Sequence, residues 1–246
     1  MNKFATTAQD GVTFNHLNGQ LRIAGPNFFS TVKYQQGREI LESSNFVLPK
    51  GDVIASVLHA CFMQKDFIHT QAAMLFLHQL EKTGFWIYSR VYWTDIGVYT
   101  IDEERCAVNE DADEKYKDPK DIPRYLAKEM ANGISLSNGV TWSRDGKIRF
   151  APNETYRLGF HNAETLTDDG FAIALLGIEG AKKVAAIVNK FYKRGAYLAE
   201  KDFPQAPSSN GVVKKTAAIF CKPDLLVLVG TCEPQLKSST FGIQKP

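Results

Sequence analysis

Residues 85–93 read FWIYSRVYW, a run of aromatic and β-branched residues that is typical of a β-strand. Successive side chains of a strand point to opposite sides, so the run divides into two faces. One face consists of Phe85, Ile87, Val91 and Trp93. The opposite face, which we call the aromatic strand face, consists of Trp86, Tyr88, Arg90 and Tyr92.

The aromatic strand face has an unusual composition for a strand surface that meets water. Such a surface normally carries Thr, Lys, Glu or Ser, whereas Trp and Tyr are residues that interfaces favour. Three aromatic rings and an arginine can stack on bases, on sugar rings or on a partner surface. We therefore interpret this face as a contact surface for a partner protein or a second copy of the chain. The alternative is that a helix covers these aromatics inside the fold.

The segments around this strand predict a mixture of helices and strands. An apolar stripe at Ala73, Phe76, Leu77 and Leu80 predicts a helix that Asp66 begins and Gly84 ends. A second strand is expected over residues 96–101. Further helices are expected over 30–43, 52–62, 122–130, from Thr167 onward and over 181–194.

Three sites of chain reversal indicate antiparallel pairing. Asn18-Gly19 and Asp145-Gly146 each stand between alternating runs, which is the strongest short hairpin signal. Lys222-Pro223-Asp224 separates two strands over residues 212–231, and a tight turn there would pair Cys221 with a residue close to Leu226. Strands and helices do not alternate regularly. The sequence therefore predicts an α+β fold, with antiparallel hairpins and a sheet packed with about six helices.

The length of 246 residues suffices for one large hydrophobic core, since a chain of this mass buries about 70% of its surface. We expect a single α+β domain over residues 1–246. The acidic stretch 102–121 holds nine carboxylates against four cations. This stretch either separates two lobes or is an excursion from one domain.

Charge, apolar runs and cysteines restrict the compartment. A net charge of +2 does not indicate a nucleic-acid-binding protein by itself. No apolar run approaches the ~20 residues of a membrane helix, so we expect no membrane association. The N-terminal segment lacks the apolar core of a signal peptide, and the four cysteines form no CxxC pair. These features favour a cytoplasmic protein with reduced thiols.

No motif specific to a catalytic class, a metal or a cofactor is present, so we expect neither metal nor cofactor. His69 and His78 stand nine residues apart, which places them on opposite sides of a helix. The catalytic candidate is His161, which has Glu164, Asp168 and Asp169 nearby for acid/base chemistry. The competing explanation is that the two aspartates stabilise a helix N-terminus.

The helix expected over 181–194 carries a cluster of cations on the side opposite its apolar stripe. Its candidate binding residues are Lys182, Lys190 and Lys193. They would suit a phosphate group, although cations near a helix C-terminus also occur as a solvated face.

Two function classes follow. The first is a cytoplasmic, non-catalytic binding or interaction protein that contacts a protein partner or its own copy through the aromatic strand face. The second is an enzyme, such as a hydrolase of a phosphorylated or nucleic-acid substrate, built on His161 and the basic helix. A nucleic-acid-binding module without chemistry is a further alternative. The sequence leaves open whether the protein is an enzyme.

Overall fold

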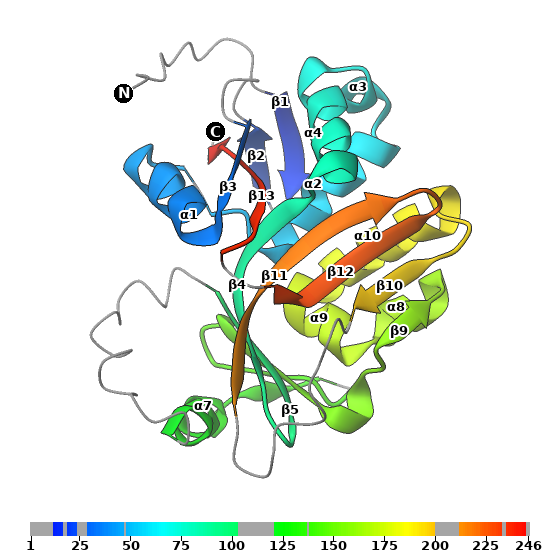
Figure 1. Cartoon of the computed structure of the whole chain (residues 1–246). Coiled ribbons are helices and arrows are strands. Elements are labelled where there is room, and N and C mark those ends of the chain that lie inside the picture. Colours follow the sequence, from blue (N-terminus) through cyan, green and yellow to red (C-terminus); the bar gives the residue numbers. More distant parts are fainter. Residues whose placement is uncertain are drawn as a thin grey trace.

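The computed structural model describes residues 12–16, 19–23, 29–46, 48–102, 121–136, 138–199, 212–232 and 235–244. These residues form an α+β fold, as predicted, with a large curved sheet and helices on both of its faces (Figure 1). None of the helices in these ranges has the length and apolar character required to cross a membrane.

The described residues form eight helices, more than the six expected. They are α1 (Tyr34–Ser43), α2 (Gly51–Met63), α3 (Lys65–Ile68), α4 (Gln71–Lys82), α7 (Asp121–Met130), α8 (Ala163–Asp168), α9 (Gly170–Leu176) and α10 (Ile178–Phe191). Two features account for the excess: a side-chain cap divides the helix predicted from Asp66 to Gly84, and α8 precedes the helix predicted from Thr167 onward. Thr70 accepts a hydrogen bond from the Ala73 amide and starts α4 separately from α3, and Asp169 caps α9 directly after α8.

The main sheet has eleven strands. Its principal order is β6 (Ile134–Ser135), β7 (Thr141–Trp142), β8 (Ile148–Pro152), β5 (Gly97–Asp102), β4 (Phe85–Trp93), β11 (Val213–Lys222), β12 (Leu225–Cys232), β10 (Ala196–Ala199) and β9 (Gly159–His161). Beside this path, β13 (Lys237–Phe241) pairs with both β4 and β3 (Phe29–Lys33). Most pairs are antiparallel; β10 with β12 and β13 with β4 are parallel.

A smaller sheet consists of β1 (Val12–His16), β2 (Gly19–Ile23) and β14 (Ile243–Gln244). The predicted hairpin near residue 18 is confirmed, although Gly19 belongs to a strand and not to the turn. His16 pairs with Gly19, so the connection is formed by residues 17–18, which lie outside the described residues. Gly19 is the first residue of β2 and does not have the positive φ expected of a turn position.

The other two reversals match the predictions. Gly146 has a φ of +69° in the turn between β7 and β8, a conformation that favours glycine. In the β11–β12 hairpin, Cys221 pairs with Leu226, and Asp224 occupies the turn with a φ of +61°. The helix predicted over 30–43 begins later, because residues 29–33 form β3 and pair with the distant β13.

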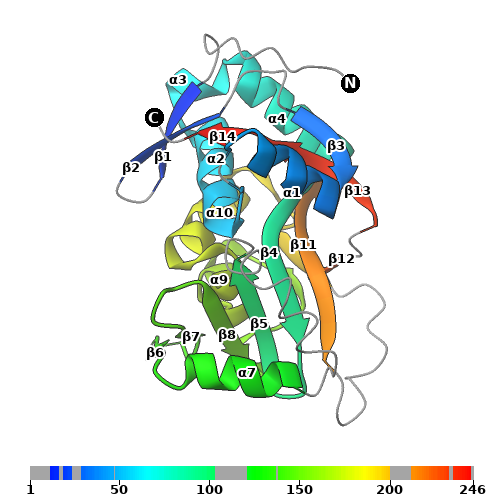
Figure 2. The same ribbon diagram turned by 90° about the vertical axis from the view of Figure 1, so that its left-hand side faces the viewer.

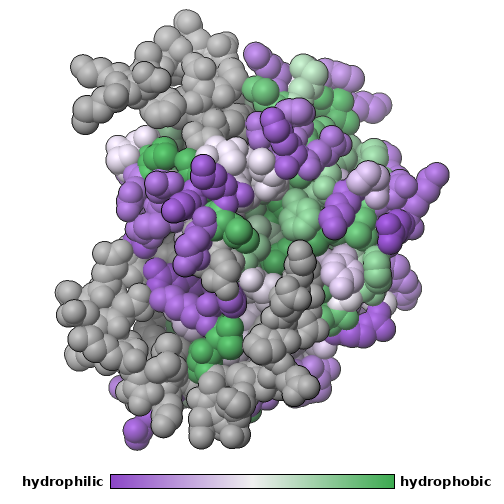
Figure 3. All heavy atoms as spheres, in the orientation of Figure 1, coloured by the Kyte–Doolittle hydropathy of each residue, from purple (hydrophilic) through white to green (hydrophobic). Residues whose placement is uncertain are grey.

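The two faces predicted for residues 85–93 pack against different parts of the chain. Phe85, Ile87, Val91 and Trp93 belong to the main core, where α2, α9 and α10 cover the sheet. The opposite face is covered by α1 near the top and α7 near the bottom (Figure 2). Next to these helices, β12 places Leu225, Val227 and Val229 on the same side of the sheet, where they are buried. The surface over β12 is apolar (Figure 3).

Strands from both sides of the acidic stretch 102–121 join this one sheet. β5 pairs with β4 on one side and with β8 on the other, although β8 follows the stretch in the sequence. Residues 103–120 lie outside the described residues.

A buried carboxylate connects the sheet to the helices at the end of β5. The Asp102 side chain is 2% exposed, and its Oδ2 lies 3.3 Å from Lys50 Nζ and 3.3 Å from an Arg149 guanidinium nitrogen. Its Oδ1 accepts a hydrogen bond from the Ser89 hydroxyl at 3.2 Å. Lys50 precedes α2 and Arg149 is on β8, so one carboxylate joins three strands and a helix.

Ser89 reaches Asp102 from an irregular part of β4. Along the β4–β11 ladder, Arg90 pairs with Thr216 but Ile87 pairs with Ala217, so Tyr88 and Ser89 have no β11 partner in this register. The Tyr88 amide donates instead to the carbonyl of Pro49 at 3.1 Å. This bulge draws β4 toward the segment that carries Lys50.

The substitution Asp102→Asn should destabilise the fold by about 3–5 kcal/mol, because it leaves two cations near a neutral group in a buried site. Urea unfolding monitored by circular dichroism would measure this change. Asp95→Asn is the matched control, since Asp95 is exposed in the loop between β4 and β5. Equal stability of both variants would show that Asp102 does not hold these elements together.

Candidate functional site

The aromatic strand face lies inside the fold. Trp86, Tyr88 and Tyr92 are 1%, 0% and 6% exposed, so the expectation of an exposed contact surface is wrong for these three rings. Tyr34 of α1 packs edge-on against Trp86 with ring centroids 5.3 Å apart. The alternative interpretation, in which a helix covers the aromatics, therefore describes the folded chain.

The polar atoms of this face also have partners within the chain. The Trp86 indole donates to the carbonyl of Val32 at 2.9 Å, and the Tyr88 hydroxyl donates to Thr240 Oγ1 at 3.2 Å. Arg90 is half-buried. These contacts explain the Trp and Tyr content by burial with a satisfied polar end.

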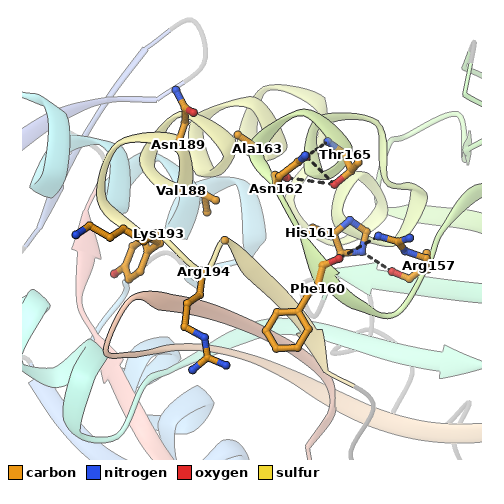
Figure 4. A pocket seen from close by; sticks show the side chains of 12 residues that line it. Arg157, Phe160, His161, Asn162, Ala163, Thr165, Val188, Asn189, Lys193 and Arg194 are labelled. Atoms are coloured by element: carbon orange, nitrogen blue, oxygen red, sulfur yellow. Dashed lines mark hydrogen bonds between the residues drawn. The ribbon is translucent and has the colours of Figure 1, made fainter.

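Two of the predicted candidates, His161 and Lys193, line the same pocket, which is separate from the aromatic strand face. They line a pocket of about 420 Å³ between the start of α8 and the end of α10, at the edge of the sheet where β9 pairs with β10 (Figure 4). The pocket has three cationic side chains, namely Arg157, Lys193 and Arg194. We call it the cationic pocket. None of the described residues that line it is an aspartate or glutamate.

Capping and a close backbone contact set the shape of the cationic pocket. Asn162 caps α8 by accepting a hydrogen bond from the Thr165 amide at 2.8 Å. Gly195, with a φ of +86°, follows α10 and brings β10 against β9. A Cβ atom at this position would lie 2.2 Å from the carbonyl oxygen of His161, so the approach requires glycine.

The two arginines of the pocket flank Phe160. Arg157 donates from its guanidinium to the Phe160 carbonyl at 3.0 Å, and the Arg194 guanidinium lies over the Phe160 ring, 5.8 Å from its centroid. In Figure 4, the Arg194 and Phe160 side chains extend toward the same side of the pocket. Within the described residues, no carboxylate lies at ion-pair distance from Arg157, Lys193 or Arg194. The pocket thus presents positive charge that no carboxylate of the described residues neutralises.

His161 forms part of the pocket wall and is 4% exposed. Its Nε2 lies 2.6 Å from the carbonyl oxygen of Arg157, which places a proton on this nitrogen. Its Nδ1 is buried and has no hydrogen-bond partner among the described residues. A buried nitrogen without a partner costs free energy, and because Nδ1 is itself covered, it does not open into the pocket.

Asp169 stands behind His161, with 3.8 Å between Asp169 Oδ2 and His161 Nε2. Burial raises the pKa of the Asp169 carboxyl, while hydrogen bonds from backbone amides oppose the increase. These amides belong to Arg157 and Ala172, each 2.9 Å away. Asp169 therefore holds the turn before β9 and the start of α9, which is a positioning task.

The other basic candidates lie outside the cationic pocket. Lys182, in the first turn of α10, forms an exposed ion pair of 2.8 Å with Glu179. Lys190 lies near the other end of the helix, over the ring of Phe191 at 5.2 Å from its centroid. The basic helix and the aromatic strand face do not form a common groove, because the aromatics are buried under α1 and α7.

A second polar cluster joins β1, α2 and α10. Ser56 Oγ lies 3.0 Å from His16 Nδ1, accepts a hydrogen bond from Lys183 Nζ at 2.9 Å, and donates to the carbonyl of Asp52 at 2.9 Å. His16 Nε2 is 3.9 Å from an Asp52 carboxylate oxygen. Ser56 is only 2% exposed and its hydroxyl is fully engaged, so the cluster stabilises the packing of three elements.

Arg194, the last residue of the helix expected over 181–194, belongs to the predicted cluster of cations, whereas Arg157 and Phe160 are the pocket residues that sequence reasoning missed. No local pattern marks them, because β9 and β10 are too short to show a period. The only usable signals were the Asn162 cap and the glycine after the basic helix. Cys61, Cys221 and Cys232 are free thiols, and Cys106 lies outside the described residues. Nowhere in the described ranges do three His, Cys, Asp or Glu side chains meet closely enough to hold a metal ion.

Comparison with known proteins gives no family for this chain. No family model, no curated protein and no solved structure matches it. Functional inference therefore rests on the geometry of the cationic pocket.

The polar cluster at Ser56 predicts a pH effect on stability. Burial lowers the pKa of His16, an effect that the nearby Asp52 carboxylate opposes and Lys183 and Lys50 reinforce. As the pH falls, the His16 side chain therefore binds a proton at a higher pH in the unfolded chain than in the folded chain. The contribution of His16 to stability is complete above pH ~6.5 and is lost as the pH falls below this value. His16→Gln should reduce the loss of unfolding free energy between pH 7.5 and pH 5.

Urea unfolding at several pH values measures this difference. His78→Gln is the control, because His78 is exposed on α4, and it should keep the pH dependence of the unchanged protein. The same pH dependence in His16→Gln and the unchanged protein would contradict the assignment.

Proposed function

We propose that the protein is a non-catalytic binding protein whose ligand carries a phosphate-like anion, and that the anion occupies the cationic pocket. The observation that carries the proposal is the concentration of Arg157, Lys193 and Arg194 around a cavity with no carboxylate among its described lining residues. Guanidinium groups present several donors in a fixed plane, and this arrangement suits the oxygens of a phosphate.

The size of the cationic pocket supports the same class of ligand. The pocket volume of about 420 Å³ exceeds the space that a single phosphate requires and falls within the range of small-molecule sites.

Binding suits this geometry better than hydrolysis. His161 Nε2 is used by the Arg157 carbonyl, and Asp169 is used by two backbone amides. The remaining imidazole nitrogen, His161 Nδ1, is buried and does not open into the pocket, so it does not reach a water molecule that it could activate. We further infer a cytoplasmic location, which the free thiols of Cys61, Cys221 and Cys232 support.

Isothermal titration with inorganic pyrophosphate tests the proposal. The unchanged protein should bind pyrophosphate, and Arg157→Ala or Arg194→Ala should each weaken binding roughly tenfold through loss of a charge-assisted hydrogen bond. Both side chains are exposed, so their removal should leave the melting temperature nearly unchanged.

Lys182→Ala is the matched control, since it removes an exposed cation of the same helix, α10, that does not line the pocket. It should leave the affinity unchanged. Absence of pyrophosphate binding, or an equal loss in the Lys182 variant, would contradict a specific anion site.

A further inference from the structure

A second cavity adjoins the cationic pocket at the end of α10. It has a volume of about 620 Å³ and lies between α2, α4, α10 and the β11–β12 turn. Three aromatic residues line it, namely Phe62, Phe191 and Tyr192. We call it the aromatic pocket. Tyr192 lines both cavities, so this residue stands between the two pockets.

From this juxtaposition we infer that the ligand is a nucleoside phosphate, with its phosphate in the cationic pocket and its base in the aromatic pocket. The inference rests on the proposed function and specifies the chemical class of its ligand.

The aromatic pocket offers ring surfaces on which a base can stack. The centroid of Phe62 lies 5.1 Å from that of Phe191 and 5.9 Å from that of Tyr192. Phe191 is nevertheless 39% exposed, so part of its ring remains uncovered. Stacking on aromatic side chains is the usual way in which proteins hold an unpaired base.

Charged and polar groups at the pocket distinguish a base from a purely apolar ligand. Glu81, Lys222 and Asp224 are exposed residues that contribute to its lining. Their carboxylates and ammonium group supply acceptors and donors for the polar edge of a base. An acyl chain has no hydrogen-bonding groups with which to use them.

On each side of the C-terminal end of α10, a cationic side chain lies over a phenylalanine ring. Lys190 lies over Phe191 beside the aromatic pocket, and Arg194 lies over Phe160 beside the cationic pocket. Phe160 is 52% exposed, and these two rings are the large exposed phenylalanines of the described chain. Interleaved cations and exposed rings are typical of surfaces that bind nucleotides or single-stranded nucleic acid.

The test compares pyrophosphate with ADP by isothermal titration, using the whole protein. ADP should bind at least about tenfold more tightly than pyrophosphate, because its base adds a stacking contact. Phe191→Ala should remove that advantage and leave the pyrophosphate affinity unchanged, whereas Arg194→Ala should weaken both ligands.

Two further variants make the result specific. Phe191→Leu keeps an apolar side chain but removes the ring, so it should also lose the advantage of ADP. Met74→Ala removes a 57% exposed apolar side chain of α4 that does not line the aromatic pocket, and it should change neither affinity. Melting temperatures of all variants verify that they fold.

Pyrophosphate binding without tighter ADP binding would overturn the inference and leave the proposed function intact. Equal weakening of both ligands by Phe191→Ala would overturn it as well. If neither ligand binds the unchanged protein, the proposed function itself fails.

A single-stranded RNA of ten nucleotides distinguishes the two sources of this chemistry. Binding more than tenfold tighter than ADP, sensitive to Phe191→Ala, assigns the site to single-stranded nucleic acid. Equal or weaker binding with the same sensitivity assigns it to a free nucleotide.

Discussion

The buried carboxylate of Asp102 is the constraint on which the arrangement of the sheet and helices depends. Two cations, Lys50 and Arg149, approach it from a helix start and from a neighbouring strand. Arg149 also donates to the carbonyl of Ala174, near the C-terminal end of α9. Because that end of α9 leads through Gly177 directly into α10, the charge cluster also determines where α10 lies on the sheet. The cationic pocket lies at the far end of α10, so its position also depends on this cluster.

Cations at the end of α10 have a role in the fold whether or not a ligand is bound. The C-terminal end of a helix carries partial negative charge, so Lys190 and Lys193 are favourably placed there. The partial negative charge of the helix end therefore offsets part of the positive charge of a binding site at this position. The same physical argument explains why the sequence alone could not separate a ligand site from a solvated helix face.

Local periodicity predicted the strand faces well but not what covers them. The division of residues 85–93 into two faces is correct, as is the pairing of Cys221 with Leu226. The exposure expected for Trp86 and Tyr88 is wrong, because the covering residue Tyr34 comes from a helix about 50 positions earlier in the chain. Alternation reports the side of a strand to which a residue points, and it contains no information on distant elements.

The candidate site was accessible to sequence reasoning only in part. His161 and Lys193 were found because each stands near a helix end with charged neighbours. Arg157 and Arg194 line one pocket because β9 pairs with β10, two strands of three and four residues. Such short strands show no alternation, so their pairing could not be predicted. The aromatic pocket likewise depends on the β11–β12 turn reaching α4 and α10, which is a tertiary contact.

The pairing of β3 with β13 has a consequence for the order of folding. Thr31 and Ser239, opposite each other in these strands, are 208 positions apart in the sequence. Closing so long a loop is slow compared with forming the local hairpins. Since α1 continues directly from β3, it can settle over Trp86 and Tyr88 only once β13 has joined the two ends of the chain. A chain in which this pairing has not formed exposes the aromatic side of β4, so it is vulnerable to aggregation through a surface that the finished fold conceals.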